Sequence, residues 1–177
     1  MPRLFTGLEI PQEAAGALAA MRGGVFGARW LEPENYHITL RFSGDIDART
    51  ADDIADELDD VRRAPLDVQF DGLSWFGGDK PRAIVARIKP TAELLDLQAT
   101  HERRLRRLGL PPETRSYQPH VTLARLRQVS PMAMADYLGS RGGLSAPGFE
   151  ASRFVLYSAR DSVGGGPYLV EAAYPLG

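Results

Sequence analysis

The chain has 177 residues, of which 44% are hydrophobic and 25% are charged, values typical of a folded protein rather than a disordered one. Its formal net charge is −2, so it lacks the basic excess of proteins that bind long nucleic acid, and any nucleic-acid substrate would be held by an end or as a short fragment. It has no cysteine, which removes disulfides, thiolate nucleophiles and cysteine zinc sites.

Neither a membrane span nor an export signal is predicted. No apolar run approaches the roughly 20 residues that cross a bilayer, and the first ten residues lack a basic-then-apolar signal pattern. Nothing in the sequence is typical of a coiled coil. We therefore expect a cytoplasmic monomer.

Hydrophobic periodicity predicts strands and helices that alternate along most of the chain. Thr91 is the expected N-cap of the third helix, and Asp47 or Thr50 that of the second. In chain order we expect a strand over 4–10, a helix over 11–22, strands at 30–31 and 36–42, a helix to about 63, strands over 66–75 and 82–89, a helix to 108, a strand over 116–126, a helix over 130–138, and a hairpin of strands 149–158 and 168–176.

Two of these strands carry the same local pattern. His37-Ile38-Thr39-Leu40 and His120-Val121-Thr122-Leu123 are each a histidine, an aliphatic residue, a threonine and a leucine, with an arginine close behind. Strand alternation places each histidine on the face of its threonine and the aliphatic residues on the opposite face. Two of only three histidines in the chain therefore belong to one repeated motif.

The repeat predicts an α+β fold with two pseudo-symmetric lobes. We expect mostly antiparallel sheet, helices outside, and a cleft between the lobes where the two motifs meet. Residues 1–177 would form this single bilobal domain. The third histidine, His101, falls on an apolar helical stripe, where a place at the edge of the core is the simpler interpretation.

Two facing imidazoles are suited to general acid–base catalysis near neutral pH. One can donate a proton to a leaving oxygen while the other takes a proton from water. Threonine hydroxyls can donate to phosphate oxygens, and the planar guanidinium of Arg125 can neutralise their charge. No acidic or histidine cluster has metal-ligand spacing, so we expect a reaction without a metal or other cofactor. The alternative is that both histidines are merely hydrogen-bonded within buried strands.

At these residues the chain resembles the two-histidine (2H) phosphoesterase superfamily, whose signature is a pair of His-x-Thr/Ser motifs. More narrowly, it is similar to the RNA 2′,3′-cyclic phosphodiesterases, historically called 2′–5′ RNA ligases. The resemblance spans almost the whole chain, includes residues 35–42, and is strongest over residues 119–125. It also includes Arg29-Trp30, Pro81-Arg82 and Tyr168.

The resemblance implies hydrolysis of a 2′,3′-cyclic phosphate at an RNA or nucleotide end to a 2′-phosphomonoester. By analogy His37 protonates the departing 3′ oxygen and His120 activates water. Thr39 and Thr122 would hold the phosphate oxygens with Arg125. Phe42 is similar to the aromatic residue that lines the nucleotide pocket of the family.

Strict alternation, however, places Arg125 and Phe42 opposite their histidines. Either the strands bulge near their ends, or other residues take these roles, and Arg41 on the His37 face is the obvious substitute. The sequence also leaves open ATP-independent 2′–5′ ligation at the same site, hydrolysis of a small cyclic nucleotide, and a non-catalytic module that binds RNA ends.

Overall fold

The computed structural model describes residues 3–141, 143–159 and 166–177. The strands are β1 (Arg3–Glu9), β2 (Ala28–Trp30), β3 (His37–Asp45), β4 (Leu66–Val68), β5 (Phe70–Phe76), β6 (Ala83–Ile88), β7 (His120–Leu126), β8 (Phe149–Ala151), β9 (Arg153–Ala159) and β10 (Tyr168–Pro175). The helices are α1 (Gln12–Ala19), α2 (Ala48–Leu58), α3 (Ala92–Arg107) and α4 (Pro131–Arg141), with a short 3-10 turn η1 (Pro33–Asn35) before β3.

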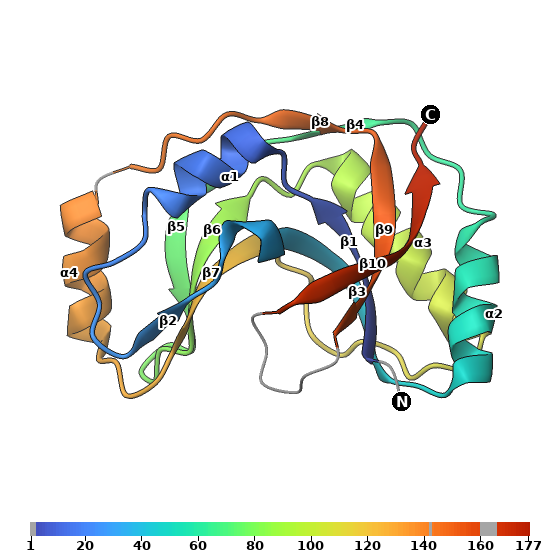
Figure 1. Ribbon diagram of the computed structural model, residues 1–177, viewed down its shortest axis with the longest axis horizontal. Coiled ribbons are helices and arrows are strands. Elements are labelled where there is room, and N and C mark those ends of the chain that lie inside the picture. The colour runs from blue at the N-terminus through green and yellow to red at the C-terminus, as the bar shows by residue number, and fades with distance from the viewer. Residues whose placement is uncertain (1–2, 142, 160–165) are drawn as a thin grey trace.

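One antiparallel sheet runs through both halves of the described chain in the order β10-β9-β1-β3-β7-β6-β5, and β2 pairs with β7 beside this path. The two central strands, β3 and β7, pair only where Ile38 lies opposite Val121. The sheet therefore divides into two lobes at that point. The helices α2 and α3 lie along the lobe of β1, β3 and β9, whereas α1 and α4 lie beside β5, β6 and β2 (Figure 1).

The aliphatic residues of the two motif strands form the centre of the core. Ile38, Val121 and Leu123 have no exposed surface, and Leu40 is 2% exposed. Burial of each such side chain contributes about 1.5–3 kcal/mol to folding. Because the aliphatic side chains pack in the core, the histidines and threonines lie on the opposite face of both strands. The predicted α+β class, the two lobes and the antiparallel sheet are confirmed.

Side-chain caps begin two of the helices as expected. Asp47, rather than Thr50, caps α2: its carboxylate accepts a hydrogen bond from the Thr50 amide at 2.7 Å. Thr91 caps α3, and its hydroxyl accepts from the Leu94 amide at 3.3 Å. His101 lies on the buried face of α3 with no exposed surface, deeper than the core edge that its position on the stripe predicts.

Two predicted long strands are wrong, because each divides into two. Residues 66–75 form β4 and β5, separated at Gln69, and residues 149–158 form β8 and most of β9, separated at Ser152. The first pieces, β4 and β8, pair with each other in a separate two-stranded sheet. The alternation of apolar residues continues across the break at Gln69, so periodicity alone does not reveal that the chain changes sheets.

Other predicted boundaries also differ, most of all the end of the second helix and the start of the strand at His120. The helix α2 ends at Leu58 rather than near residue 63. Its last turn has no basic residue and is followed by Asp59 and Asp60, which are unfavourable beside the negative end of the helix dipole. The strand β7 begins at His120 rather than residue 116. The β9–β10 pair is the predicted final hairpin, although part of its loop, residues 160–165, lies outside the described residues.

Candidate active site

Both histidines are held by the main chain in the same way. Nδ1 of His37 lies 2.9 Å from the carbonyl oxygen of Asn35, and Nδ1 of His120 lies 2.6 Å from that of Gln118. The carbonyl oxygen comes from the second residue before the histidine in each case. Since a carbonyl only accepts, Nδ1 carries the proton and donates it, so that Nε2 of the neutral ring is an acceptor. The two main-chain contacts thus orient both imidazoles alike and leave Nε2 as the accepting nitrogen, which in His37 lies within hydrogen-bond distance of the Thr39 hydroxyl.

Both strands also carry a bulge directly after the threonine. In β3, Thr39 pairs with Gly7 and Arg41 with Thr6, which leaves Leu40 as an extra residue. A bulge of this kind returns the next residues to the opposite faces. Phe42 therefore comes back to the side of His37, where it is 45% exposed.

The second bulge has the same position in its strand. In β7, Thr122 pairs with Val85 and Ala124 with Ile84, so Leu123 is the extra residue. Arg125 becomes exposed as a result, on the side of His120. The expectation from strict alternation that Arg125 and Phe42 face away from the histidines is corrected by these two bulges.

His37 is surrounded by aromatic rings. Its ring centroid lies 4.9 Å from those of Phe5 and Tyr168 and 5.4 Å from that of Tyr157. Its pKa is lowered to about 4, mainly by burial and also by the nearby charges of His120 and Arg125, while the hydrogen bond to Asn35 opposes the shift. Its Nε2 lies 3.1 Å from the hydroxyl of Thr39. The influence of His120 on this pKa places the two histidines within electrostatic reach of each other.

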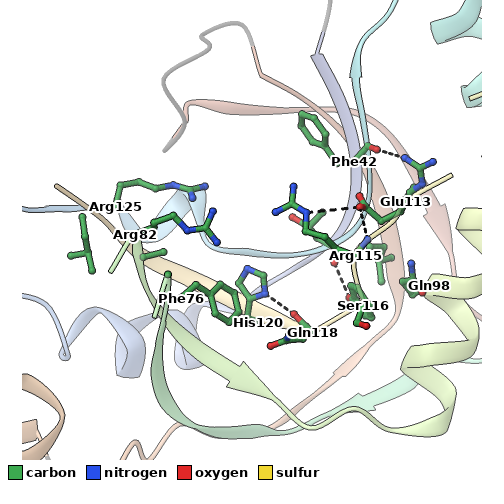
Figure 2. A pocket seen from close by; sticks show the side chains of 17 residues that line it. Phe42, Phe76, Arg82, Gln98, Glu113, Arg115, Ser116, Gln118, His120 and Arg125 are labelled. Carbon is green, nitrogen blue, oxygen red and sulfur yellow. Dashed lines mark hydrogen bonds and ion pairs between the residues drawn. The ribbon is translucent and has the colours of Figure 1, made fainter. Parts of the chain in front are cut away.

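His120 has a more open surrounding. A single ring, that of Phe76, meets it edge-on with centroids 4.7 Å apart. Burial lowers its pKa as well, and Arg125 acts in the same direction. His120 lines a cavity of about 740 Å³, and its ring faces this space in Figure 2.

The cavity brings together most of the predicted site residues. Thr39, Phe42, His120 and Arg125 all line it, and Arg41 borders it. His37 and Thr122 are not among its lining residues. Both have intermediate exposure, and the strand pattern keeps Thr122 on the face of His120.

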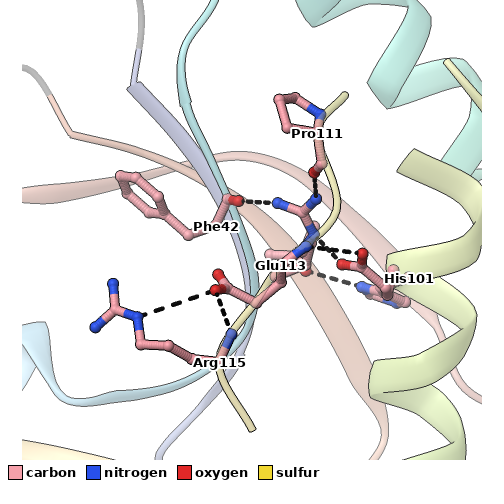
Figure 3. A network of polar contacts seen from close by, with 8 residues as sticks. Phe42, His101, Pro111, Glu113 and Arg115 are labelled. Atoms are coloured by element: carbon pink, nitrogen blue, oxygen red, sulfur yellow. Dashed lines mark hydrogen bonds and ion pairs between the residues drawn. The ribbon is translucent and has the colours of Figure 1, made fainter. Parts of the chain in front are cut away.

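The guanidinium of Arg41 binds protein groups away from the histidines. Arg41 is only 6% exposed, forms an ion pair with Glu102 of α3, and donates to the carbonyl oxygens of Phe42 and Pro111. Glu102 also accepts from the amide of Glu113 at 3.0 Å. Figure 3 shows how these contacts tie the segment after α3 to β3. The bulge at Leu40 therefore corrects the prediction that Arg41 shares the face of His37.

Sequence reasoning missed several residues of the cavity wall. Phe76 ends β5, Gly77 and Arg82 come from the loop between β5 and β6, and Glu113 and Arg115 come from the segment after α3. Arg115 lies 4.0 Å from the Glu113 carboxylate. The dipeptide Pro81-Arg82 belongs to the resemblance, but nothing in local periodicity shows that its arginine approaches Arg125.

The described part of the chain carries neither a cluster of metal ligands nor a membrane-spanning helix. No three histidine, aspartate or glutamate side chains there are grouped so that they could hold a metal ion. No helix there is long and apolar enough to span a bilayer.

Comparison with known proteins gives consistent matches. The family described as LigT-like phosphoesterase matches residues 8–85 and 88–168. The RNA 2′,3′-cyclic phosphodiesterase of Aeropyrum pernix is 31% identical over 144 residues, covering 77% of this chain and 82% of its own. The protein of the same name from Bacillus subtilis is 31% identical and covers 70% of this chain and 71% of its own.

Solved structures share the fold. A crystal structure of a Thermus thermophilus protein superposes with a TM-score of 0.82 at 22% identity and covers 98% of this chain and 97% of that one. A crystal structure of E. coli LigT complexed with 3′-AMP gives a TM-score of 0.78 at 21% identity over 99% of both chains. The resemblance inferred from the two histidine motifs is confirmed.

Proposed function

Because the chain belongs to the LigT-like phosphoesterase family, we propose that it hydrolyses 2′,3′-cyclic phosphates at RNA or nucleotide ends to 2′-phosphomonoesters. One observation carries this proposal. Two His-x-Thr half-sites have the same main-chain anchor and the same bulge, and each histidine directly precedes a member of the Ile38–Val121 pair that joins β3 to β7. The related enzymes named RNA 2′,3′-cyclic phosphodiesterase supply the substrate class.

In the proposed reaction His120 takes a proton from water at Nε2 while the water oxygen attacks phosphorus. The bond from phosphorus to the 3′ oxygen breaks, and His37 donates a proton from Nε2 to that oxygen. His120 suits the base because it faces the cavity from which water arrives. Aromatic rings surround His37, and its pKa is lowered. A lowered pKa makes the protonated imidazole a stronger acid, which favours proton donation to the leaving oxygen.

The remaining residues stabilise the phosphate. We assign the hydroxyls of Thr39 and Thr122 to the non-bridging oxygens and Arg125 to the negative charge. Phe42, exposed on the cavity wall, offers a ring on which a base can stack. Arg41 is assigned no contact with substrate, since Glu102 and two carbonyl oxygens hold its guanidinium. A single domain, a monomeric state and a cytoplasmic location remain predictions.

A short RNA ending in a 2′,3′-cyclic phosphate tests the proposal. We expect only the 2′-phosphate product, with the same rate in the presence of EDTA. A 3′-phosphate product, or activity that EDTA removes and a metal restores, would contradict the proposed mechanism. Addition of a second RNA with a 5′-hydroxyl end to the same assay measures 2′–5′ ligation directly, and in dilute solution we expect hydrolysis to dominate.

A further inference from the structure

The cavity beside His120 holds more positive charge than one cyclic phosphate requires. Three arginines other than the buried Arg41 line it, namely Arg82, Arg115 and Arg125. Arg115 is balanced by the nearby carboxylate of Glu113. Among the residues that the structure describes, neither Arg82 nor Arg125 forms an ion pair, and both side chains are exposed.

Arg82 and Arg125 are neighbours across two strands. Ala83 pairs with Arg125, and the carbonyl oxygen of Arg82 accepts from the amide of Leu126 at 2.8 Å. Figure 2 shows the two guanidinium groups side by side, directed into the same space. Two adjacent cations without a carboxylate repel each other, and an anionic ligand with more than one charge relieves that repulsion.

The loop before β6 fixes the main chain of Arg82. Its amide donates to the carbonyl oxygen of Phe76 at 2.7 Å, and the Lys80 amide donates to that of Gly77 at 2.9 Å. Gly77 has a φ of +111°, and a Cβ there would lie 2.2 Å from the Lys80 carbonyl oxygen and 2.9 Å from Cγ of Arg82. The turn thus needs glycine, and it delivers Arg82 to the wall of the cavity.

We infer that Arg82 binds a second phosphate, the one attached to the 5′ oxygen of the nucleoside that carries the cyclic phosphate. This inference rests on the proposed function. The cyclic ester carries one negative charge, which Arg125 and the two threonine hydroxyls balance. The site then discriminates a nucleotide with a 5′ phosphate from a nucleoside 2′,3′-cyclic phosphate with a free 5′-hydroxyl. The cavity volume of 740 Å³ lies in the upper part of the range of small-molecule sites, about 300–1,000 Å³.

The phosphate could be the diester of an RNA chain or the monoester of a single nucleotide. Three substrates separate these sources: a nucleoside 2′,3′-cyclic phosphate, its 5′-phosphorylated form, and a dinucleotide with the same cyclic end. We expect kcat/KM to be about 10- to 100-fold higher for at least one 5′-phosphorylated form, the range of a hydrogen bond between charged groups. A preference for the dinucleotide identifies an RNA end, and one for the mononucleotide identifies a small nucleotide.

Substitution of Arg82→Gln should remove this preference, because it should lower kcat/KM for the 5′-phosphorylated forms far more than for the plain nucleoside cyclic phosphate. Arg82→Lys, which keeps the charge without the planar fork, should be intermediate. Lys80→Gln is the matched control: it removes one positive charge from the same loop, and Lys80 is exposed but does not line the cavity. The inference is overturned if the wild type shows no preference, or if Arg82→Gln slows all substrates equally.

A binding measurement separates this inference from the proposed reaction. Calorimetry compares a nucleoside 2′-phosphate with the 2′,5′-bisphosphate of the same nucleoside. We expect the bisphosphate to bind about 10- to 100-fold more tightly to the wild type and no more tightly to Arg82→Gln. Equal binding of both to the wild type overturns the inference. A preference without any hydrolysis of cyclic phosphates would uphold the subsite and contradict the proposed function instead.

Discussion

The two half-sites at His37 and His120 share their backbone but not their surroundings. Each histidine begins a strand, donates to a carbonyl oxygen two residues earlier, and precedes a threonine and a bulged leucine. Yet three rings surround His37, whereas one ring and an open cavity border His120. The repeated backbone places two equivalent imidazoles, and their neighbours make them chemically different.

The two bulges also combine the same backbone with different side chains. After the bulged leucine, β3 continues with Arg41 and Phe42, and β7 continues with Ala124 and Arg125. One half therefore has a buried ion pair and an exposed ring, and the other has a small buried residue and an exposed cation. Equivalent positions thus carry an exposed aromatic ring on one side and an exposed positive charge on the other.

The largest effect is expected from removal of either histidine. His37→Ala and His120→Ala should each lower kcat/KM by about 10²- to 10⁴-fold, because each removes one proton-transfer group. The double variant should be little slower than the slower single variant, since the pair acts as a unit. Steady-state kinetics measures both. Losses that multiply in the double variant would mean that the half-sites act independently.

Arg41 and Ala124 occupy equivalent positions after the bulged leucine, but only Arg41 forms a buried ion pair. We expect this pair to contribute to the free energy of unfolding. Glu102→Gln leaves the Arg41 guanidinium buried without a counter-charge, so the free energy of unfolding should fall by about 3–5 kcal/mol. Replacement of both Arg41 and Glu102 by methionine should recover much of that loss. Urea unfolding measures the free energy of unfolding of each variant. A loss below about 1 kcal/mol would mean that the pair behaves like one on the surface.

Arg125 acts on both half-sites, so its removal should change both. Arg125→Gln should lower kcat/KM by about 10- to 100-fold through the lost contact with phosphate. Its positive charge lowers the pKa of His37 and of His120, so both limbs of the pH profile should move to higher pH. The control Arg127→Gln removes an exposed charge just after β7 that does not line the cavity. An unmoved profile would show that Arg125 lies too far from the histidines to act on them.

The smallest effects should distinguish the aromatic neighbours. Burial is the main cause of both lowered pKa values, so entry of water should raise them toward the ordinary value of about 6.5. Tyr168→Ala should raise the pKa of His37 alone, and Phe76→Ala that of His120 alone. Titration of the imidazole nitrogens by NMR measures each histidine separately. A common shift of both histidines in either variant would contradict two separate environments.

Much of this arrangement could be predicted from local sequence. The two His-x-Thr strands, their faces and the α+β fold follow from alternation and from repetition of one short motif. The bulges could not be read from the pattern, because Leu40 and Leu123 are as apolar as ordinary core residues. Bulges entered only as one of two ways to bring Phe42 and Arg125 to the faces of their histidines, the other being that different residues take these roles.

Residues contributed by loops were beyond prediction. Arg82 reaches the cavity because of a turn that requires Gly77, and Arg115 because Arg41 and Glu102 hold the segment after α3. Both placements depend on contacts between residues far apart in the chain. Periodicity within one strand or helix carries no information about such contacts.

The pH dependence of kcat/KM tests the paired-histidine mechanism most directly, measured from about pH 3.5 to 9 in the wild type and both single variants. The wild type should give a bell with its maximum on the acidic side of the ordinary histidine pKa, because both pKa values are lowered. His120→Ala should lose the decline at low pH, since no base then needs to be deprotonated. His37→Ala should lose the decline at high pH, since no acid then needs to keep its proton. If either variant keeps both limbs of the bell, that histidine is not one of the two titrating groups.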